Sequence, residues 1–243
     1  MPQTALITGA AHRVGAAIAR ALHGAGMNVV LHYRSSAEAV RSLCEELETA
    51  RPDSVVTLQA DLLAFDNLSA LVDQTVAAWG RLDCLVNNAS TFYPTPLEQA
   101  TAPQWDDLLG TNLRAPFFLS QAAAPWLRIT GGNIVNIVDI YAERPLKDHP
   151  IYSIAKAGLT MLTKALAREL GPQVRVNAVA PGTILWPERP VSDTYKTNLL
   201  ARTTLNRLGS PTEVARAVLF LVQSATYTSG HILTVDGGRS LMP

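Results

Sequence analysis

Tyr152 and Lys156 are the two residues whose types and spacing most directly suggest chemistry. Four positions apart on one helix, their side chains would project from the same face. An ammonium group beside a phenol stabilises the phenolate, which lowers the phenol pKa from its usual value of about 10 toward working pH. The phenol could then serve as an acid or a base. Because any helix can carry this pair by chance, the pair alone establishes no catalytic site.

A second candidate site is the turn that follows the first apolar segment. Gly9 precedes the turn, Gly15 follows it, and Arg13 and Val14 lie between them. Glycine permits a tight turn and the close approach of a ligand, and free N–H groups at a helix start attract an anionic phosphate. The turn therefore suits a dinucleotide pyrophosphate. Glycines that serve only the geometry of the turn are the alternative interpretation.

The residues after the second apolar segment indicate which dinucleotide is bound. In dinucleotide-binding folds, an acidic residue roughly 20 positions beyond the glycine turn binds the ribose hydroxyls of NAD. Here no carboxylate appears before Glu38. An arginine among hydroxyl groups would bind a 2′-phosphate instead, which favours NADPH; a solvated turn is the alternative. The residues concerned are His32, Tyr33, Arg34 and Ser35.

Asp61 and Leu62 follow the third apolar segment. At this place an acid can accept a hydrogen bond from the adenine amino group, and a leucine can cover the ring. Asp61 could equally cap a helix.

The elements that must position these residues alternate along the chain. Such alternation predicts parallel strands joined by helical crossovers, in a doubly wound α/β sheet with helices on both faces and ligands at the carboxyl ends of the strands. No linker or repeat interrupts the pattern, so we expect one domain over residues 1–243. The seven predicted strands are 4–8, 28–32, 55–58, 84–87, 133–138, 174–180 and 231–235, and the predicted helices are 15–24, 37–50, 67–79, 111–127, 152–170 and 211–222.

Three segments carry further expectations. The stretch 181–210 exceeds usual loop lengths and is predicted to be a substrate lid. The helices 111–127 and 152–170 are apolar or small on most of their circumference, so each needs cover on both sides. A symmetric contact between subunits would supply it, and additional cover from the same chain is the alternative.

Composition limits the classes of function. The 20 basic and 20 acidic residues cancel, so no overall field attracts nucleic acid or an anionic membrane. Cys44 and Cys84 are too few for a metal motif or a disulfide framework. Neither a signal peptide nor an apolar run of membrane-spanning length is recognisable. We therefore expect a cytoplasmic protein without a metal site.

Six motifs taken together resemble those of the short-chain dehydrogenase/reductase family over essentially the whole chain. The resemblance implies a Rossmann-type domain, Tyr152 as proton donor, Lys156 as ligand of the nicotinamide ribose, Asn112 as holder of a relay water, and a homotetramer. Asn88, Ala89, Pro181 and Gly182 would contact the cofactor. The motifs are Thr8-Gly9, Asn87-Asn88-Ala89, Asn112, Tyr152 with Lys156, Pro181-Gly182 and Asp236-Gly237-Gly238.

Three departures from the usual family pattern resemble the pteridine reductases. Asp139 stands where the family's serine partner of the tyrosine is expected, Arg13 replaces the middle glycine of the phosphate turn, and Ser90 replaces the glycine after Asn-Asn-Ala. The segments His32 to Ser35 and Asn87 to Leu97 are similar to those enzymes as well.

These departures suit a pterin, a flat polar ring with several nitrogens. Phe92 could stack on the ring and hold it against the nicotinamide. Arg13 and Ser90 would contact the pterin edge and the cofactor phosphates, and Asp139 beside Tyr152 would help to protonate a ring nitrogen. We also expect Leu185 and Trp186 to contact the substrate from the lid.

The hypothesis is therefore NADPH-dependent reduction of a dihydropterin, and of an oxidised pterin or folate, to the tetrahydro form. Each role has an alternative: Phe92 as plain core, Asp139 as ion-pair partner of Arg144 or Lys147, and Arg13 in a structural pair with an acid. The alternative functions are a carbonyl reductase acting on an oxoacyl or other ketone, and a non-catalytic NADP(H)-binding sensor.

Overall fold

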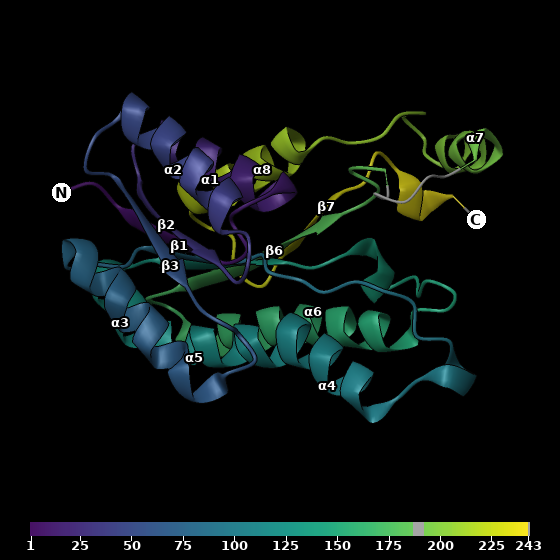
Figure 1. The fold of residues 1–243 in the computed structure, drawn as a ribbon, viewed down its shortest axis with the longest axis horizontal. Helices are drawn as coiled ribbons and strands as arrows, with labels where there is room; N and C mark the ends of the chain where they lie inside the picture. The colour runs from purple at the N-terminus through teal and green to yellow at the C-terminus, as the bar shows by residue number, and fades with distance from the viewer. Residues whose placement is uncertain (187–191, 243) are drawn as a thin grey trace.

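A computed structural model describes residues 1–186 and 192–242 as a sheet covered on both faces by helices (Figure 1). All seven strands are parallel, and their order is β3-β2-β1-β4-β5-β6-β7. The strands are mostly apolar and the central ones are buried, as expected where both faces of a sheet are covered. Their bounds are Thr4–Ile7 (β1), Asn28–Tyr33 (β2), Val55–Gln59 (β3), Cys84–Asn87 (β4), Asn133–Ile137 (β5), Arg175–Pro181 (β6) and Ile232–Val235 (β7).

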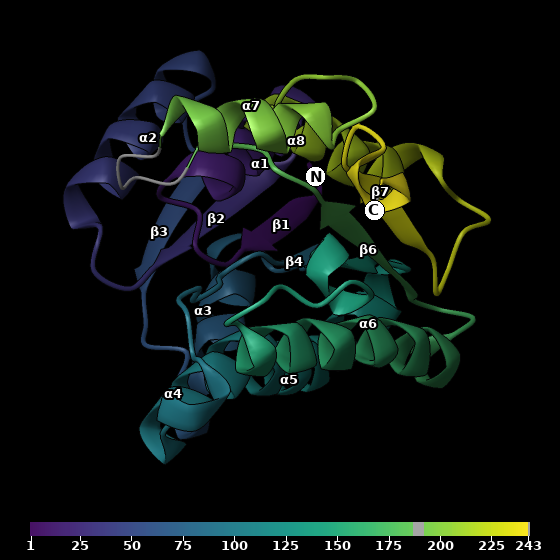
Figure 2. The ribbon, with the colours of Figure 1, turned by 90° about the vertical axis from the view of Figure 1, so that its right-hand side faces the viewer.

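The helices form two layers. α1, α2 and α8 cover one face of the sheet, α3, α5 and α6 cover the other, and α4 packs against α6 on that second side (Figures 1 and 2). α7 lies near the C-terminus, beyond the ends of the strands. The bounds are Arg13–Gly24 (α1), Ala37–Ala50 (α2), Leu68–Trp79 (α3), Ala102–Leu109 (α4), Ala115–Thr130 (α5), Pro150–Leu170 (α6), Asp193–Ala201 (α7) and Pro211–Leu219 (α8).

The order of the strands reverses between β1 and β4, which are direct neighbours in the sheet. The chain leaves β1 toward β2 on one side and returns to β4 on the other. Ligands of such sheets bind in the crevice outside the carboxyl ends of the strands at this reversal. The segments that follow β1 and β4 are therefore brought together there, and they begin with Thr8-Gly9 and Asn88-Ala89.

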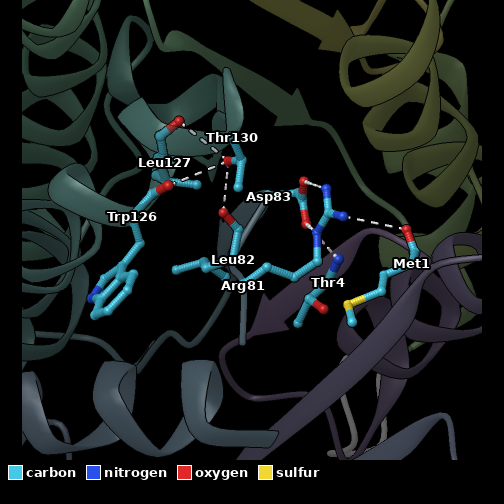
Figure 3. Close-up of polar contacts among 8 residues, drawn as sticks. All are labelled: Met1, Thr4, Arg81, Leu82, Asp83, Trp126, Leu127 and Thr130. Atoms are coloured by element: carbon cyan, nitrogen blue, oxygen red, sulfur yellow. Dashed lines mark hydrogen bonds and ion pairs between the residues drawn. The ribbon is translucent and has the colours of Figure 1, made fainter. Parts of the chain in front are cut away.

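The opposite end of the sheet is tied by polar contacts before β1 and β4 (Figure 3). Asp83 accepts two hydrogen bonds from the Arg81 guanidinium, at 2.8 and 2.6 Å, and one from the Thr4 backbone N–H at 2.8 Å. The Thr130 hydroxyl at the end of α5 donates to the Leu82 carbonyl at 2.8 Å. These contacts fasten the amino ends of the two central strands to each other and to α5.

Several expectations about the elements were incomplete. The predicted lid 181–210 contains helix α7, and residues 187–191 of that segment lie outside the described residues. Helix α4 was not predicted. The predicted helix 111–127 is interrupted, because Gly110–Arg114 is a π-helical turn and α5 starts only at Ala115. Within residues 1–186 and 192–242, every helix is too short or too polar to cross a membrane.

Candidate active site

The turn after β1 is tightly packed, and its contacts leave no room for a side chain at Gly15. Gly9 has φ +62°, and the Asn88 side-chain amide donates to the carbonyls of Thr8 and Gly9 at 2.8 and 3.0 Å. A Cβ on Gly15 would collide with the Gly9 carbonyl and lie 2.7 Å from Asn88 Nδ2. Arg13 opens α1 with φ +52°, a left-handed conformation that is unusual for a residue with a side chain.

His32 braces this turn from the neighbouring strand. Its Nδ1 accepts the Gly9 N–H at 3.1 Å, and its Nε2 lies 3.1 Å from the Ala60 carbonyl, so Nε2 carries the proton. Burial lowers the pKa of His32, which keeps the ring neutral in this arrangement. The expected cofactor contact of His32 is thus limited to the ring surface, because both nitrogens bind backbone groups of the protein.

A cavity of about 520 Å³, here called the front cavity, runs from the β1 turn to Tyr152 and Lys156. It is large enough for a dinucleotide end and a small planar ring in the usual range of ligand sites. The sequence-predicted site residues that line it are Gly9, Arg13, Val14, His32, Tyr33, Arg34, Ser35, Asp61, Leu62, Asn88, Ala89, Ser90, Phe92, Asp139, Tyr152, Lys156 and Pro181.

Four of the predicted site residues do not line the front cavity. Asn112 is buried behind it, and Gly182 packs against Asp236 and donates its N–H to the Val235 carbonyl at 3.0 Å. Leu185 is exposed and Trp186 is half-buried, at the start of the predicted lid. The expected substrate contacts of Leu185 and Trp186 remain predictions.

Asp139 and Tyr152 form the polar centre at the inner end of the front cavity. The Tyr152 hydroxyl donates to Asp139 Oδ2 at 2.8 Å, and Asp139 Oδ1 accepts the Tyr141 N–H at 2.9 Å. The alternative ion pair of Asp139 with Arg144 is not formed, since the Arg144 guanidinium donates to the Met242 carbonyl at 2.6 Å.

The protonation of this centre differs from the sequence-based expectation. Burial, together with the adjacent Asp139 carboxylate, raises the pKa of Tyr152 well above its usual value. Burial also raises the pKa of Asp139, although its hydrogen bonds and the charge of Lys156 oppose the rise. The expectation that Lys156 lowers the phenol pKa is wrong for the protein without ligands. Tyr152 accordingly holds its proton in the protein without ligands.

Lys156 is itself buried and acts at some distance from the phenol. Its Nζ donates to the Ile137 carbonyl at 2.9 Å and lies 5.6 Å from the centroid of the Tyr152 ring. Burial lowers the pKa of Lys156 to about 8, and the nearby Asp139 carboxylate opposes this shift. The ammonium form is therefore only moderately favoured at neutral pH.

Phe92 lies at the mouth of this centre. Its ring meets the Tyr152 ring edge to face, with centroids 4.7 Å apart, and stacks on the His149 ring at 4.8 Å with an interplanar angle of 13°. The side chain is 53% exposed, so the alternative of a plain core residue is wrong. No signal in the sequence marked the contact of His149 with Phe92.

Asn112 organises the segment after β4. Its side-chain amide donates to the carbonyls of Thr91 and Leu108 at 3.0 and 2.9 Å, and its Oδ1 accepts the Ser90 hydroxyl at 2.6 Å. Asn112 lies within the π-helical turn Gly110–Arg114. Such turns are frequent at functional sites.

A protein-family model described as enoyl-(acyl carrier protein) reductase matches residues 9–240, which include the whole front cavity. The chain belongs to the short-chain dehydrogenase/reductase family. The protein is therefore an oxidoreductase of the short-chain type, and its seven-stranded sheet is the Rossmann-type fold of that family.

Three similar relatives in the short-chain family carry two kinds of name. Pteridine reductase 1 of Leishmania tarentolae is 38% identical, over 98% of this chain and 96% of its own length. The putative ketoacyl reductase 2 of the granaticin polyketide synthase of Streptomyces violaceoruber is also 38% identical, with 98% and 96% covered. The 3-oxoacyl-[acyl-carrier-protein] reductase of Staphylococcus aureus is 36% identical, with 98% of both chains covered.

Short-chain dehydrogenase/reductases bind nicotinamide cofactors, and the front cavity fits such a group. Arg13, Val14 and Gly15 at the start of α1 line this cavity, and the N-terminal end of a helix favours an anionic phosphate. Leu62 gives an apolar wall at the end of β3, and the adjacent Asp61 accepts the Leu63 N–H at 3.0 Å, so Asp61 also stabilises its own turn.

Proposed function

We propose that the protein is an NADPH-dependent pteridine reductase that converts a dihydropterin to the tetrahydro form. The observation that carries this proposal is the hydrogen bond between the Tyr152 hydroxyl and the Asp139 carboxylate, beside the exposed ring of Phe92. A carboxyl group paired with the tyrosine suits the protonation of a ring nitrogen, and an exposed aromatic ring suits a flat heteroaromatic substrate.

The preference for NADPH over NADH is supported by the residues after β2. Arg34 and Ser35 are both exposed and line the front cavity, and neither the strand nor the following turn offers a carboxylate before Glu38. A guanidinium binds a phosphate through paired, charge-assisted hydrogen bonds, whereas a carboxylate at this place would repel it. When bound, NADPH supplies the hydride for the carbon of the reduced C=N bond.

The chain's own residues supply the proton for the nitrogen. Tyr152 holds its proton in the free protein, and the carboxyl of Asp139 accepts the hydrogen bond from its hydroxyl. A proton passed from Tyr152 to the substrate is replaced from a protonated Asp139 across this 2.8 Å bond. Lys156 anchors on the Ile137 carbonyl and provides a positive charge that offsets the negative charge left behind.

Substrate binding follows from the residues around this centre. Phe92 would stack on one face of the pterin, and Ser90, held by Asn112, would present its hydroxyl to the polar edge of the ring. Arg13 lines the same cavity from the other side and would contact both the ring edge and the cofactor phosphates. Oxidised pterins and folates share this flat ring, so we propose them as further substrates.

The exposed apolar side chains of α5 and α6 support the proposal of a homotetramer. Phe117 is exposed on α5, and Ile154 and Met161 are exposed on α6. Large apolar side chains gathered on two adjacent helices favour a subunit contact.

The decisive experiment measures oxidation of NADPH with dihydrobiopterin and compares it with oxidation by a panel of ketones. The Tyr152→Phe variant should lose turnover by at least about a hundredfold while it still binds NADPH, because only the proton donor is removed. NADPH binding is followed by fluorescence. Unchanged turnover in this variant contradicts the role of Tyr152.

A carbonyl reductase is the second candidate, and it is favoured by the names of the two ketoacyl reductase relatives. Faster NADPH oxidation with an oxoacyl ketone than with dihydrobiopterin would establish it in place of the pterin proposal. Binding of NADPH without turnover of either substrate class would favour a non-catalytic sensor.

A further inference from the structure

Asp139 lines two cavities. Besides the front cavity, it lines a second cavity of about 280 Å³, here called the rear cavity. Besides Asp139, the polar side chains around the rear cavity are those of Glu143, Arg144, Thr160, Thr234 and Ser240, and these five residues do not line the front cavity. Asp139 therefore borders both the substrate side of the site and a second polar space.

The rear cavity is enclosed by the last residues of the described chain. The turn Arg239–Leu241 contributes Ser240, whose N–H donates to the Asp236 carboxylate at 2.7 Å. Arg144 holds the same segment through its hydrogen bond to the Met242 carbonyl. On the opposite wall, the Thr160 hydroxyl donates to the Lys156 carbonyl at 3.0 Å. Contacts from three separate elements thus define this space.

The rear cavity has the size and lining that water needs. A water molecule takes up about 30 Å³ and requires two to four polar partners. A space of about 280 Å³ exceeds this several times over, and its hydroxyl, carboxylate and guanidinium groups can hold a connected chain of waters. Such a chain conducts protons between hydrogen-bonding groups.

We propose that the rear cavity is the route by which protons from solvent reach Asp139 during the reduction. When the Asp139–Tyr152 pair gives its proton to the substrate nitrogen, the resulting Asp139 carboxylate takes a proton from a water in the rear cavity. That water is reprotonated from bulk solvent. Each reduced double bond thus consumes one hydride and one solvent proton. The proposal rests on the proposed reductase function, although it does not require that the substrate be a pterin.

The surroundings of Asp139 are consistent with this direction of proton flow. Burial raises the pKa of Asp139, which makes its protonated form accessible closer to neutral pH. The titratable and charged groups that face Asp139 or line the rear cavity are Tyr152 and Lys156 on α6, Tyr141, Glu143 and Arg144 after β5, and Arg239 near the chain end, which acts on the Tyr141 hydroxyl.

The test fills the rear cavity without touching the front one. Ala142 lines only the rear cavity of the two, so Ala142→Leu should displace its water, and Ala142→Ser is the matched control that preserves the polar space. We expect kcat to fall roughly tenfold in Ala142→Leu, because return of the proton becomes limiting. The solvent deuterium isotope effect on kcat should rise, while the substrate KM and the NADPH Kd stay unchanged. Ala142→Ser should behave as the wild type.

A second variant and a structural measurement keep the test decisive. Thr160→Val removes one hydroxyl at nearly constant volume and should shift kcat and the isotope effect in the same direction. A high-resolution crystal structure of the wild type should contain ordered water within hydrogen-bond distance of Asp139 in the rear cavity. A dry rear cavity in that structure overturns the proposal. The proposal is also overturned if a crystal structure shows that the new side chain of the Ala142→Leu variant fills the rear cavity while kcat and the isotope effect equal those of the wild type.

Failure of the proposed function is distinguishable from failure of this proposal. A wild-type protein that reduces neither pterins nor ketones contradicts the reductase function. The proposed proton route is then contradicted as well, because it requires that function. If the wild type reduces pterins or ketones and the Ala142→Leu variant with a filled rear cavity is equally active, only the proton route is contradicted.

Discussion

The Tyr152 hydroxyl donates a 2.8 Å hydrogen bond to Asp139, at the position where short-chain reductases usually have a serine. A serine hydroxyl can orient the phenol and polarise a carbonyl oxygen, but it carries no exchangeable acidic proton near neutral pH. A carboxyl group can carry one, and burial shifts the pKa of Asp139 upward. Under the proposed function, the carboxyl group in place of the serine would supply a proton rather than only orient the phenol.

Asp139→Ser should convert the site to the usual family arrangement. We expect pterin reduction to fall by about a hundredfold or more, because the acid is lost, while reduction of simple ketones is retained or increases. Asp139→Asn is the matched control, since it keeps the size but neither the proton nor the charge, and it should impair both reactions. Steady-state kinetics with dihydrobiopterin and a ketone give the answer. Equal loss of both activities in Asp139→Ser would contradict the specific role of the carboxyl.

Buried Lys156 should make stability depend on pH in the alkaline range. Its folded pKa of about 8 lies below the unfolded value, so between these values the unfolded chain binds more protons and the free energy of unfolding rises with pH. The cost of burying the ammonium is fully present below pH 8, where it amounts to about 3 kcal/mol. Lys156→Met should therefore be more stable than the wild type at pH 7.

The check for Lys156 is a set of urea denaturation curves of both proteins between pH 6 and pH 10. The stability advantage of Lys156→Met should shrink progressively above pH 8. A stability difference between the two proteins that stays constant from pH 6 to pH 10 would show that burial does not lower the pKa of Lys156.

Arg34 should determine the choice between NADPH and NADH. Loss of a charge-assisted contact with the 2′-phosphate costs about 2 kcal/mol, so Arg34→Ala should raise the NADPH Kd roughly thirtyfold and hardly change the NADH Kd. Arg41→Ala on α2 removes the same charge from an exposed position outside the front cavity and serves as control. Fluorescence titrations measure all four constants. A similar loss of affinity for both cofactors would argue against a 2′-phosphate contact.

Gly15 should tolerate no side chain. Its Cβ would collide with the Gly9 carbonyl and the Asn88 amide, so Gly15→Ala should lower the free energy of unfolding by about 1–3 kcal/mol and weaken NADPH binding. A Cβ on Gly24, at the end of the same helix, would meet no atom within 4 Å. Gly24→Ala should thus be neutral or slightly stabilising, by up to about 1 kcal/mol. Guanidinium denaturation midpoints compare the two variants, and a stable Gly15→Ala protein would contradict the close packing of the turn.

Much of the fold could be predicted because its elements are repetitive and locally encoded. Buried parallel strands such as Cys84–Asn87 are short apolar runs between helix-length segments, and this one was predicted with its correct bounds. The start of α4 was also recognisable in principle. The Thr101 hydroxyl accepts from the Gln104 N–H, and the Gln104 side-chain oxygen accepts from the Thr101 N–H. This Thr-x-x-Gln capping box is visible in the sequence.

Other features depend on tertiary contacts that a sequence does not display. No local sequence pattern marked the π-helical turn at Gly110–Arg114, in which Asn112 makes hydrogen bonds with Thr91 and Ser90. The stack of His149 on Phe92 joins residues that are far apart in the sequence. The pKa of Tyr152 was mispredicted because charge proximity was considered without the burial of the phenol.

Both nitrogens of His32 are bound to backbone groups, one to the turn after β1 and one to the end of β3. The imidazole consequently bridges these two segments, and in the proposed NADPH site it would set the distance between the residues expected at the diphosphate and those expected at the adenine. Substitutions at Tyr33, Arg34 or Ser35 that change the preference for NADPH over NADH would leave that distance unchanged. Replacement of the histidine would alter the length of the pocket itself, and would penalise either dinucleotide alike.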